Sequence, residues 1–145
     1  MAFCQRLSEQ LAIVATIDPV AVTGSAAVSD IFSMALHRRA LFILQTGAVF
    51  TNATVLIQEG ALVAMTAGTT ATILTGATTA ITAINSQYLF EVSGEAMAAG
   101  NSFLRASLVA TNTEVISMVV LADVERYAPG TDHDLLTVVV AGVAN

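Results

Sequence analysis

The chain has 145 residues, which suits one domain of ordinary size, and it carries a formal net charge of −6. Hydrophobic residues make up 55% of it and charged residues only 11%, whereas an average soluble domain is about 25% charged. Its basic residues are five arginines, without any lysine. We therefore expect no nucleic-acid partner, because neutralising phosphates requires clustered Lys and Arg.

A membrane role is also not expected. The longest uninterrupted apolar run, residues 115–122, has eight residues including one Ser, whereas a membrane-spanning helix needs about 20. The first residues lack the basic segment and Leu-rich core of a secretory signal. Cys4 is the only cysteine, so no intrachain disulfide can form. With so few charges to keep a surface hydrated, the composition favours a soluble assembly subunit whose surface is largely covered by partners.

The first 29 residues are predicted to form an N-terminal arm. Phe3, Leu7, Leu11 and Val14 follow helical spacing, which indicates a short amphipathic helix within residues 1–17. The Asp18-Pro19 pair should end that helix. Residues 19–29 should be extended. The arm either packs on its own domain or reaches a neighbouring subunit.

Residues 30–59 contain the first predicted strands. Residues 30–36 suggest either a short strand or a single turn leading into the core. Residues 40–46 form a continuous apolar run, which is typical of a strand that is covered on both faces. A hairpin loop from Gly47 to Asn52 is expected next. Residues 53–59 then alternate, with Val55 and Ile57 on one face.

Residues 60–87 contain no charged side chain and are rich in Thr, Ala and Gly. The Thr and Ile content predicts two short strands at about 70–75 and 79–84. A flat strand without charges at the edge of a sheet invites pairing with another chain. Such an edge is a liability in a monomer and an advantage in an assembly.

The clearest pattern spans residues 88–127. Residues 88–93 alternate, residues 93–100 suggest one helical turn ending on Gly100, and residues 101–110 alternate again. A long apolar strand should cover residues 114–126, and a last strand-like run follows at 135–141. Eight or nine short strands separated by turns predict an antiparallel β-sandwich or barrel.

The residues that could carry chemistry are few. Neither His37 nor His133 has a recognisable Ser or Cys nucleophile in a known motif, so we expect no enzyme. Asp132-His133-Asp134 could hold a metal, but consecutive strand residues point in alternate directions, and a solvated turn is favoured. Asp123 and Glu125 share a predicted strand face and could form a carboxylate pair, although solvated charges or ion pairs are favoured. Glu91 and Arg105 could pair across neighbouring strands, with a modest structural contribution. The Asn52-Ala53-Thr54 glycosylation pattern is interpreted as accidental, and no cofactor is expected.

The order of these segments resembles the head decoration, or cement, proteins of tailed bacteriophages. The resemblance rests on the apolar strand 40–47, the strand Val-Leu-Ile-Gln-Glu at 55–59, the Thr- and Gly-rich stretch, and the strand Tyr-Leu-Phe-Glu-Val at 88–92. It continues through the acidic turn ending at Gly100 and the strand beginning Phe-Leu-Arg-Ala at 103–106, and ends with Glu-Arg-Tyr-Ala-Pro at 125–129. It covers about 60% of the chain. Residues 1–29 have no counterpart.

The resemblance implies a jelly-roll-like β-sandwich on the outer surface of an icosahedral phage head, made in the host cytoplasm. It implies the major capsid protein and further copies of this chain, as a dimer or trimer, as partners. The domain prediction is an arm at 1–29, a sandwich at 30–127 and a C-terminal tail strand at 128–145. The alternatives are a tail, connector or fibre subunit, or a carbohydrate- or host-binding sandwich, which the absence of Trp disfavours. The candidate subunit interface consists of apolar residues in the arm, the uncharged segment and the tail: Phe3, Leu7, Leu11, Val14, Ile73, Ile81, Ile84, Leu136, Val138 and Val140.

Overall fold

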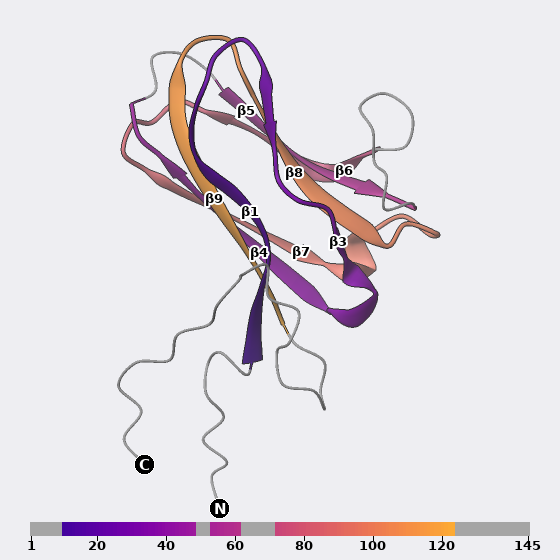
Figure 1. Ribbon diagram of the computed structural model, residues 1–145. Helices are drawn as coiled ribbons and strands as arrows, with labels where there is room; N and C mark the ends of the chain where they lie inside the picture. The colour runs from indigo at the N-terminus through magenta and orange to yellow at the C-terminus, as the bar shows by residue number, and fades with distance from the viewer. Residues whose placement is uncertain (1–9, 49–52, 62–71, 124–145) are drawn as a thin grey trace, which may run out of the picture.

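Two antiparallel β-sheets packed face to face form the described part of the protein (Figure 1). The computed structural model describes residues 10–48, 53–61 and 72–123. The strands in this part of the chain are β1 (Leu11–Val22), β2 (Ala26–Val28), β3 (Phe32–Ser33), β4 (Arg39–Thr46), β5 (Ala53–Gly60), β6 (Thr72–Ile81), β7 (Gln87–Ser93), β8 (Phe103–Ala110) and β9 (Glu114–Asp123). Two single turns of 3₁₀-helix, η1 (Met34–Leu36) and η2 (Gly94–Ala96), lie before β4 and after β7. The all-β prediction is therefore confirmed.

Sheet A has the strand order β1-β9-β4-β7, and sheet B has the order β2-β8-β5-β6 with β3 also paired to β8. Most strands that follow one another in the chain lie in different sheets, so the connections between them cross the sandwich. Among the described strands, only β5 and β6 are both consecutive and hydrogen-bonded to each other. The other ladders join segments that are distant in sequence, such as β1 with β9.

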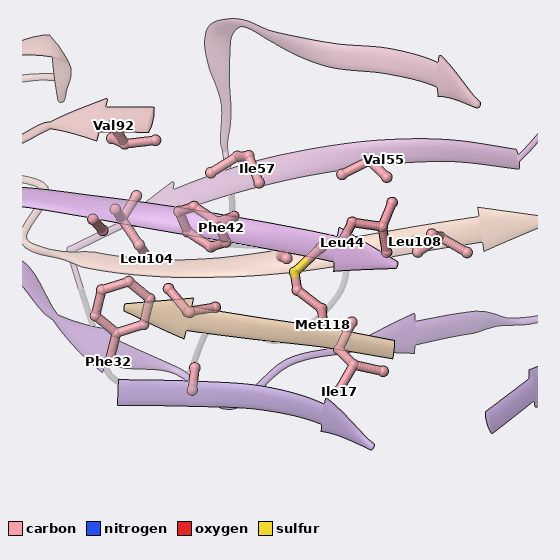
Figure 2. Close-up of a cluster of buried hydrophobic side chains, with 14 of the residues drawn as sticks. Ile17, Phe32, Phe42, Leu44, Val55, Ile57, Val92, Leu104, Leu108 and Met118 are labelled. Atoms are coloured by element: carbon pink, nitrogen blue, oxygen red, sulfur yellow. The ribbon is translucent and has the colours of Figure 1, made fainter. Parts of the chain in front are cut away.

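The core lies between the two sheets and is built from alternate residues of each strand. Phe42 and Leu44 of β4 and Met118 of β9 face Ile57 of β5 and Leu104 of β8, and all five are buried (Figure 2). Phe32 of sheet B packs on Phe42 of sheet A, with ring centroids 6.0 Å apart and planes tilted by 47°. These contacts remove large apolar surfaces from water, which is the main stabilising term for such a fold.

The predicted N-terminal helix is wrong from Leu11 onward, whereas Gln10 is helical. Leu11 and Val14 belong to β1, which pairs with β9 along sheet A. The segment is rich in β-branched residues, which prefer strands. Register shifts between Ile13 and Ala15 and between Ile17 and Val20 interrupt the alternation of inward and outward side chains. For this reason the sequence pattern did not predict a strand. Pro19 lies within β1, in the second irregularity, and an edge strand tolerates it there.

Two further sequence predictions need correction. Residues 40–46 and 53–59 are strands, but they do not form a hairpin, because β4 lies in sheet A and β5 in sheet B. In the described part of the uncharged segment, residues 72–81 form one continuous strand, β6, where separate strands at about 70–75 and 79–84 were expected. The pairing of β6 with β5 shifts register between Leu56 and Gln58, so one irregular strand replaces the two that were expected.

The strands predicted within residues 88–123 are confirmed, with the expected alternation. On β7, Phe90 and Val92 face the core whereas Leu89 and Glu91 face outward. The helical turn is present as η2, and Gly100 adopts a φ of +91°, a conformation that favours glycine. On β8, Arg105 and Ser107 alternate with the core residues Leu104, Ala106 and Leu108, and yet both are themselves buried. Residues 11–28 of the predicted arm form β1 and β2, so they are part of the sandwich.

Candidate interaction surfaces

A polar corner forms where β4 begins and β9 ends. The carboxylate oxygen Oδ1 of Asp123 accepts hydrogen bonds from the backbone N–H groups of Arg38 at 2.7 Å and Arg39 at 2.9 Å. The Nδ1–H of His37, which is buried, donates to the backbone carbonyl of Asp123. The sequence suggested a carboxylate pair between Asp123 and Glu125. Glu125 lies outside the described residues, and Asp123 serves to anchor the start of β4.

The same corner contains an open cleft of about 460 Å³, lined by residues 37–39 and 93–95. Its floor is held together by a hydrogen bond from the N–H of Gly94 to the carbonyl of Arg38, at 2.8 Å. The Oγ of Ser93 accepts from the N–H of Glu95 and caps η2, so this hydroxyl has a structural partner. The lining mixes Arg and Glu side chains and therefore favours neither anions nor cations.

The suggested ion pair between Glu91 and Arg105 is wrong, because the two residues lie in different sheets. Glu91 instead pairs with Arg39 at 3.2 Å on the outside of sheet A, where both side chains are largely exposed. Arg105 donates from Nε to Oε1 of Gln58 at 2.8 Å on sheet B. The exposed pair contributes little to stability, since exposed ion pairs are typically worth about 0–1 kcal/mol.

Two buried carboxylates occupy opposite ends of the sandwich. Glu59, at the end of β5, accepts a hydrogen bond from the N–H of Ala98 at 2.8 Å. Glu114, at the start of β9, is fully buried, and neither of its carboxylate oxygens has a hydrogen-bond partner. Burial raises the pKa of the Glu114 carboxyl, since removing the charged form from water is costly. The sequence did not single out either residue, because nothing local to them distinguishes a buried Glu from an exposed one.

The structure divides the candidate interface residues into groups. Val14 and Ile81 lie in the core, so they stabilise the sandwich itself rather than an outer surface. Leu11 is half-buried on β1, and Ile84 is 56% exposed in the turn before β7. Ile73 belongs to β6, where its backbone pairs with Gln58. The remaining five lie outside the described residues: Phe3, Leu7, Leu136, Val138 and Val140.

Several other candidates also lie outside the described residues. They include Cys4, Asn52 of the glycosylation pattern, and the Asp132-His133-Asp134 cluster. Within the described ranges, no group of three or more His, Cys, Asp and Glu side chains is placed to hold a metal ion. Likewise, no helix in this part of the chain is long and apolar enough to cross a membrane.

The outer face of sheet A is an apolar surface that the sequence-based list missed. Leu89 is 64% exposed and Val119 is 37% exposed, and both point away from the core. The sequence did contain an indication of this apolar face, because the apolar run at residues 40–46 predicted a strand covered on both faces. In the structure, the inner side chains of β4 are buried, whereas Leu41 and Ile43 on its outer side are only half-buried.

Comparisons with protein-family models, with curated proteins and with solved structures found no match to this chain.

Proposed function

We propose that the protein is a virion structural subunit, a capsid decoration protein that binds the outside of an icosahedral phage head and clamps neighbouring capsomers together. The observation that carries the proposal is the edge of sheet B. Its last strand, β6, has ten residues with neither a charge nor a proline among them. A long uncharged edge strand is a template for pairing with another chain.

The other sheet edges in the described part of the chain differ from β6 in ways that discourage pairing. β1 carries Asp18, Pro19 and two register shifts. The opposite edge of sheet B consists of β2 and β3, which have only three and two residues. β7 carries the exposed Glu91. The pairing of β6 with β5 has one register shift as well, but β6 is long and carries neither a charge nor a proline, so it is the edge best suited to sheet extension.

The proposed fold of this subunit is a jelly roll. Support comes from the strand order, in which β1-β9-β4-β7 faces β2-β8-β5-β6. In that order the first of the described strands pairs with the last of them, and most connections between successive strands pass from one sheet to the other. Two interleaved Greek keys of eight strands produce such an arrangement, and it recurs in viral capsid domains.

The mechanism of clamping would be physical. Each contact with the shell is weak, but a subunit that touches two capsomers binds the second one intramolecularly, at high effective concentration. Icosahedral symmetry repeats the contact over the whole shell. The low charge of the chain lets these contacts be apolar or made by backbone hydrogen bonds.

The test uses purified protein added to expanded, undecorated capsids, with binding measured by co-sedimentation and capsid stability by the melting temperature. Binding with a raised melting temperature is expected. Absence of binding, or binding that leaves the melting temperature unchanged, contradicts the proposal. Binding to isolated tails instead of heads would identify a tail or connector subunit.

A matched pair of variants tests the role of β6. Ala80 is exposed on β6 of sheet B, and Ala96 is exposed in η2, the turn that follows β7 of sheet A. Ala80→Lys places a charge on the edge strand and should weaken capsid binding. Ala96→Lys adds the same charge elsewhere and should bind as the unmodified protein does. Equal binding by both variants would remove β6 from the mechanism.

A further inference from the structure

Five apolar side chains form a continuous cluster on the outside of sheet A. Ile43 of β4 has two direct cross-strand partners. They are Leu89 of β7 on one side and Val119 of β9 on the other. One row further along, Leu41 of β4 lies opposite Leu121 of β9. We call this set the outer cluster of sheet A: Leu41, Ile43, Leu89, Val119 and Leu121. Their Cβ atoms lie on one face because neighbours directly opposite in antiparallel strands point the same way.

Sheet B has a different outer surface along its two central strands. On β5 and β8 the outward positions include Gln58 and Arg105, which are hydrogen-bonded to each other, together with Thr54 and Ser107. Val109 is exposed there opposite Thr54, the half-buried Leu56 lies opposite Ser107, and Ser107 also pairs with the exposed Val28 of β2. Each of these apolar residues therefore faces a polar partner across the ladder, whereas Ile43 faces Leu89 and Val119 directly. Single exposed apolar residues are ordinary, whereas a contiguous apolar patch on a sheet face marks an interaction site. The asymmetry therefore points to sheet A.

Charge favours a second copy of this chain as the occupant of the patch. Each copy has a net charge of −6, so two copies repel unless they meet at a face without excess negative charge. Among the described residues, the exposed charges beside the outer cluster are Glu91 and Arg39, which form an ion pair 3.2 Å apart and cancel each other. The outer cluster is thus a place where two acidic copies can approach with little repulsion.

We propose that the protein forms a twofold dimer in which the outer cluster of sheet A packs against the same cluster of a second copy. The contact is isologous, as in most homodimers, and it stacks two sheets face to face in the way that the sandwich stacks its own two sheets. Burial on the second side would also account for the sequence of β4, which is apolar on both faces. The dimer is independent of the proposed virion role, since it requires only purified chain.

Val119 and Val109 provide a matched pair of variants for the test. Both are valines with outward side chains on interior strands, 37% exposed on β9 of sheet A and 43% exposed on β8 of sheet B. Val119→Glu and Val109→Glu add the same charge to opposite faces. Leu89→Glu, at a 64% exposed position on the edge strand β7, supplies a second disruption with less risk to folding.

The measurements are molar mass by light scattering during gel filtration and sedimentation velocity, over a concentration series. The unmodified chain should have twice the mass of one chain. Val119→Glu and Leu89→Glu should raise the dimer dissociation constant at least tenfold, and Val109→Glu should leave it unchanged. Circular dichroism of each variant should match the unmodified protein, and only variants that pass this check are compared.

Three results would overturn the proposal. One is a monomeric mass for the unmodified chain throughout the series, as expected if another segment of the same chain covers the outer cluster. Another is a dimer that survives Leu89→Glu, which would place the contact elsewhere, for example at β6. The third is an equal loss of dimer in Leu89→Glu and Val109→Glu, which would reflect added charge alone.

Discussion

The carboxylate of Glu59 accepts a hydrogen bond from the backbone N–H of Ala98 at a distance of 2.8 Å. Glu59 lies at the end of β5 with 4% of its surface exposed, and Ala98 lies in the segment between η2 and β8. The contact satisfies a buried acceptor and a backbone donor together. It also ties the crossover from β7 to β8 onto sheet B, at the end of the sandwich opposite Glu114.

Replacing Glu59 should therefore destabilise the fold in a graded way. Glu59→Gln keeps a side-chain oxygen that can accept from Ala98, whereas Glu59→Val leaves that N–H without its partner. An intramolecular hydrogen bond contributes a net of about 0.5–1.5 kcal/mol, so Glu59→Val should lower the free energy of unfolding by that amount. Urea unfolding measures it. If Gln and Val cost the same, the hydrogen bond has no role in stability.

Glu114 should make the protein less stable as the pH rises. Burial raises the pKa of this carboxyl in the folded state above its ordinary value of 4.5. The folded state therefore holds its proton more tightly than the unfolded state does, and stability is greatest at low pH. As the pH rises above about 4.5 toward the raised pKa, the unfolded state loses its proton first, and the free energy of unfolding falls.

Glu114→Gln removes this dependence, because the amide does not ionise. The melting temperature of Glu114→Gln should match the unmodified protein at low pH and exceed it at neutral pH. Glu95→Gln, at an exposed position in η2, serves as the control and should follow the unmodified protein at every pH. The prediction is contradicted if, at neutral pH, Glu114→Gln melts at or below the melting temperature of the unmodified protein. That result would show that interactions in the folded protein stabilise the ionised Glu114 carboxylate.

The contact between Phe32 and Phe42 should couple the two sheets. Phe42 is completely buried, so Phe42→Ala should cost about 3–5 kcal/mol through lost burial and the cavity left behind. A double-mutant cycle with Phe32→Ala isolates the contact between the rings, which should contribute about 0.5–1.5 kcal/mol. Chemical denaturation of the four proteins provides the energies. Strict additivity would mean that the tilted ring pair makes no specific contribution.

Deleting residues 1–17 should unfold the protein. The deletion removes more than half of β1, including Ala12, Val14, Ala15 and Ile17, whose side chains are buried in the core. Deleting residues 1–9 instead leaves every described strand intact. Far-ultraviolet circular dichroism and thermal melting should show a folded protein for the shorter deletion only. A stably folded 18–145 fragment would mean that β1 is dispensable to sheet A.

Most strands within residues 39–60 and 87–123 could be predicted, because apolar and polar residues alternate there. In β7 every second residue is apolar and faces the core, and in β5 the same holds for Ala53, Val55 and Ile57. In β4 the apolar content is high enough to mark a strand in any register. β1 was missed because its register shifts place Val14 and Ala15 side by side in the core. The candidate interface was predicted less well, since apolar residues such as Ile81 do not reveal whether they face a core or a partner.

The sequence alone determined the all-β class and the inward faces of β5 and β7, because a period of two is a local property of the chain. Only the tertiary structure decided which strands are neighbours. Its ladders join segments far apart in the chain, as β1 joins β9. The alternation of apolar and polar residues within one strand carries no information about which strand pairs with it. The ion pair of Arg39 with Glu91, the burial of Glu114 and the outer cluster of sheet A all depend on that pairing.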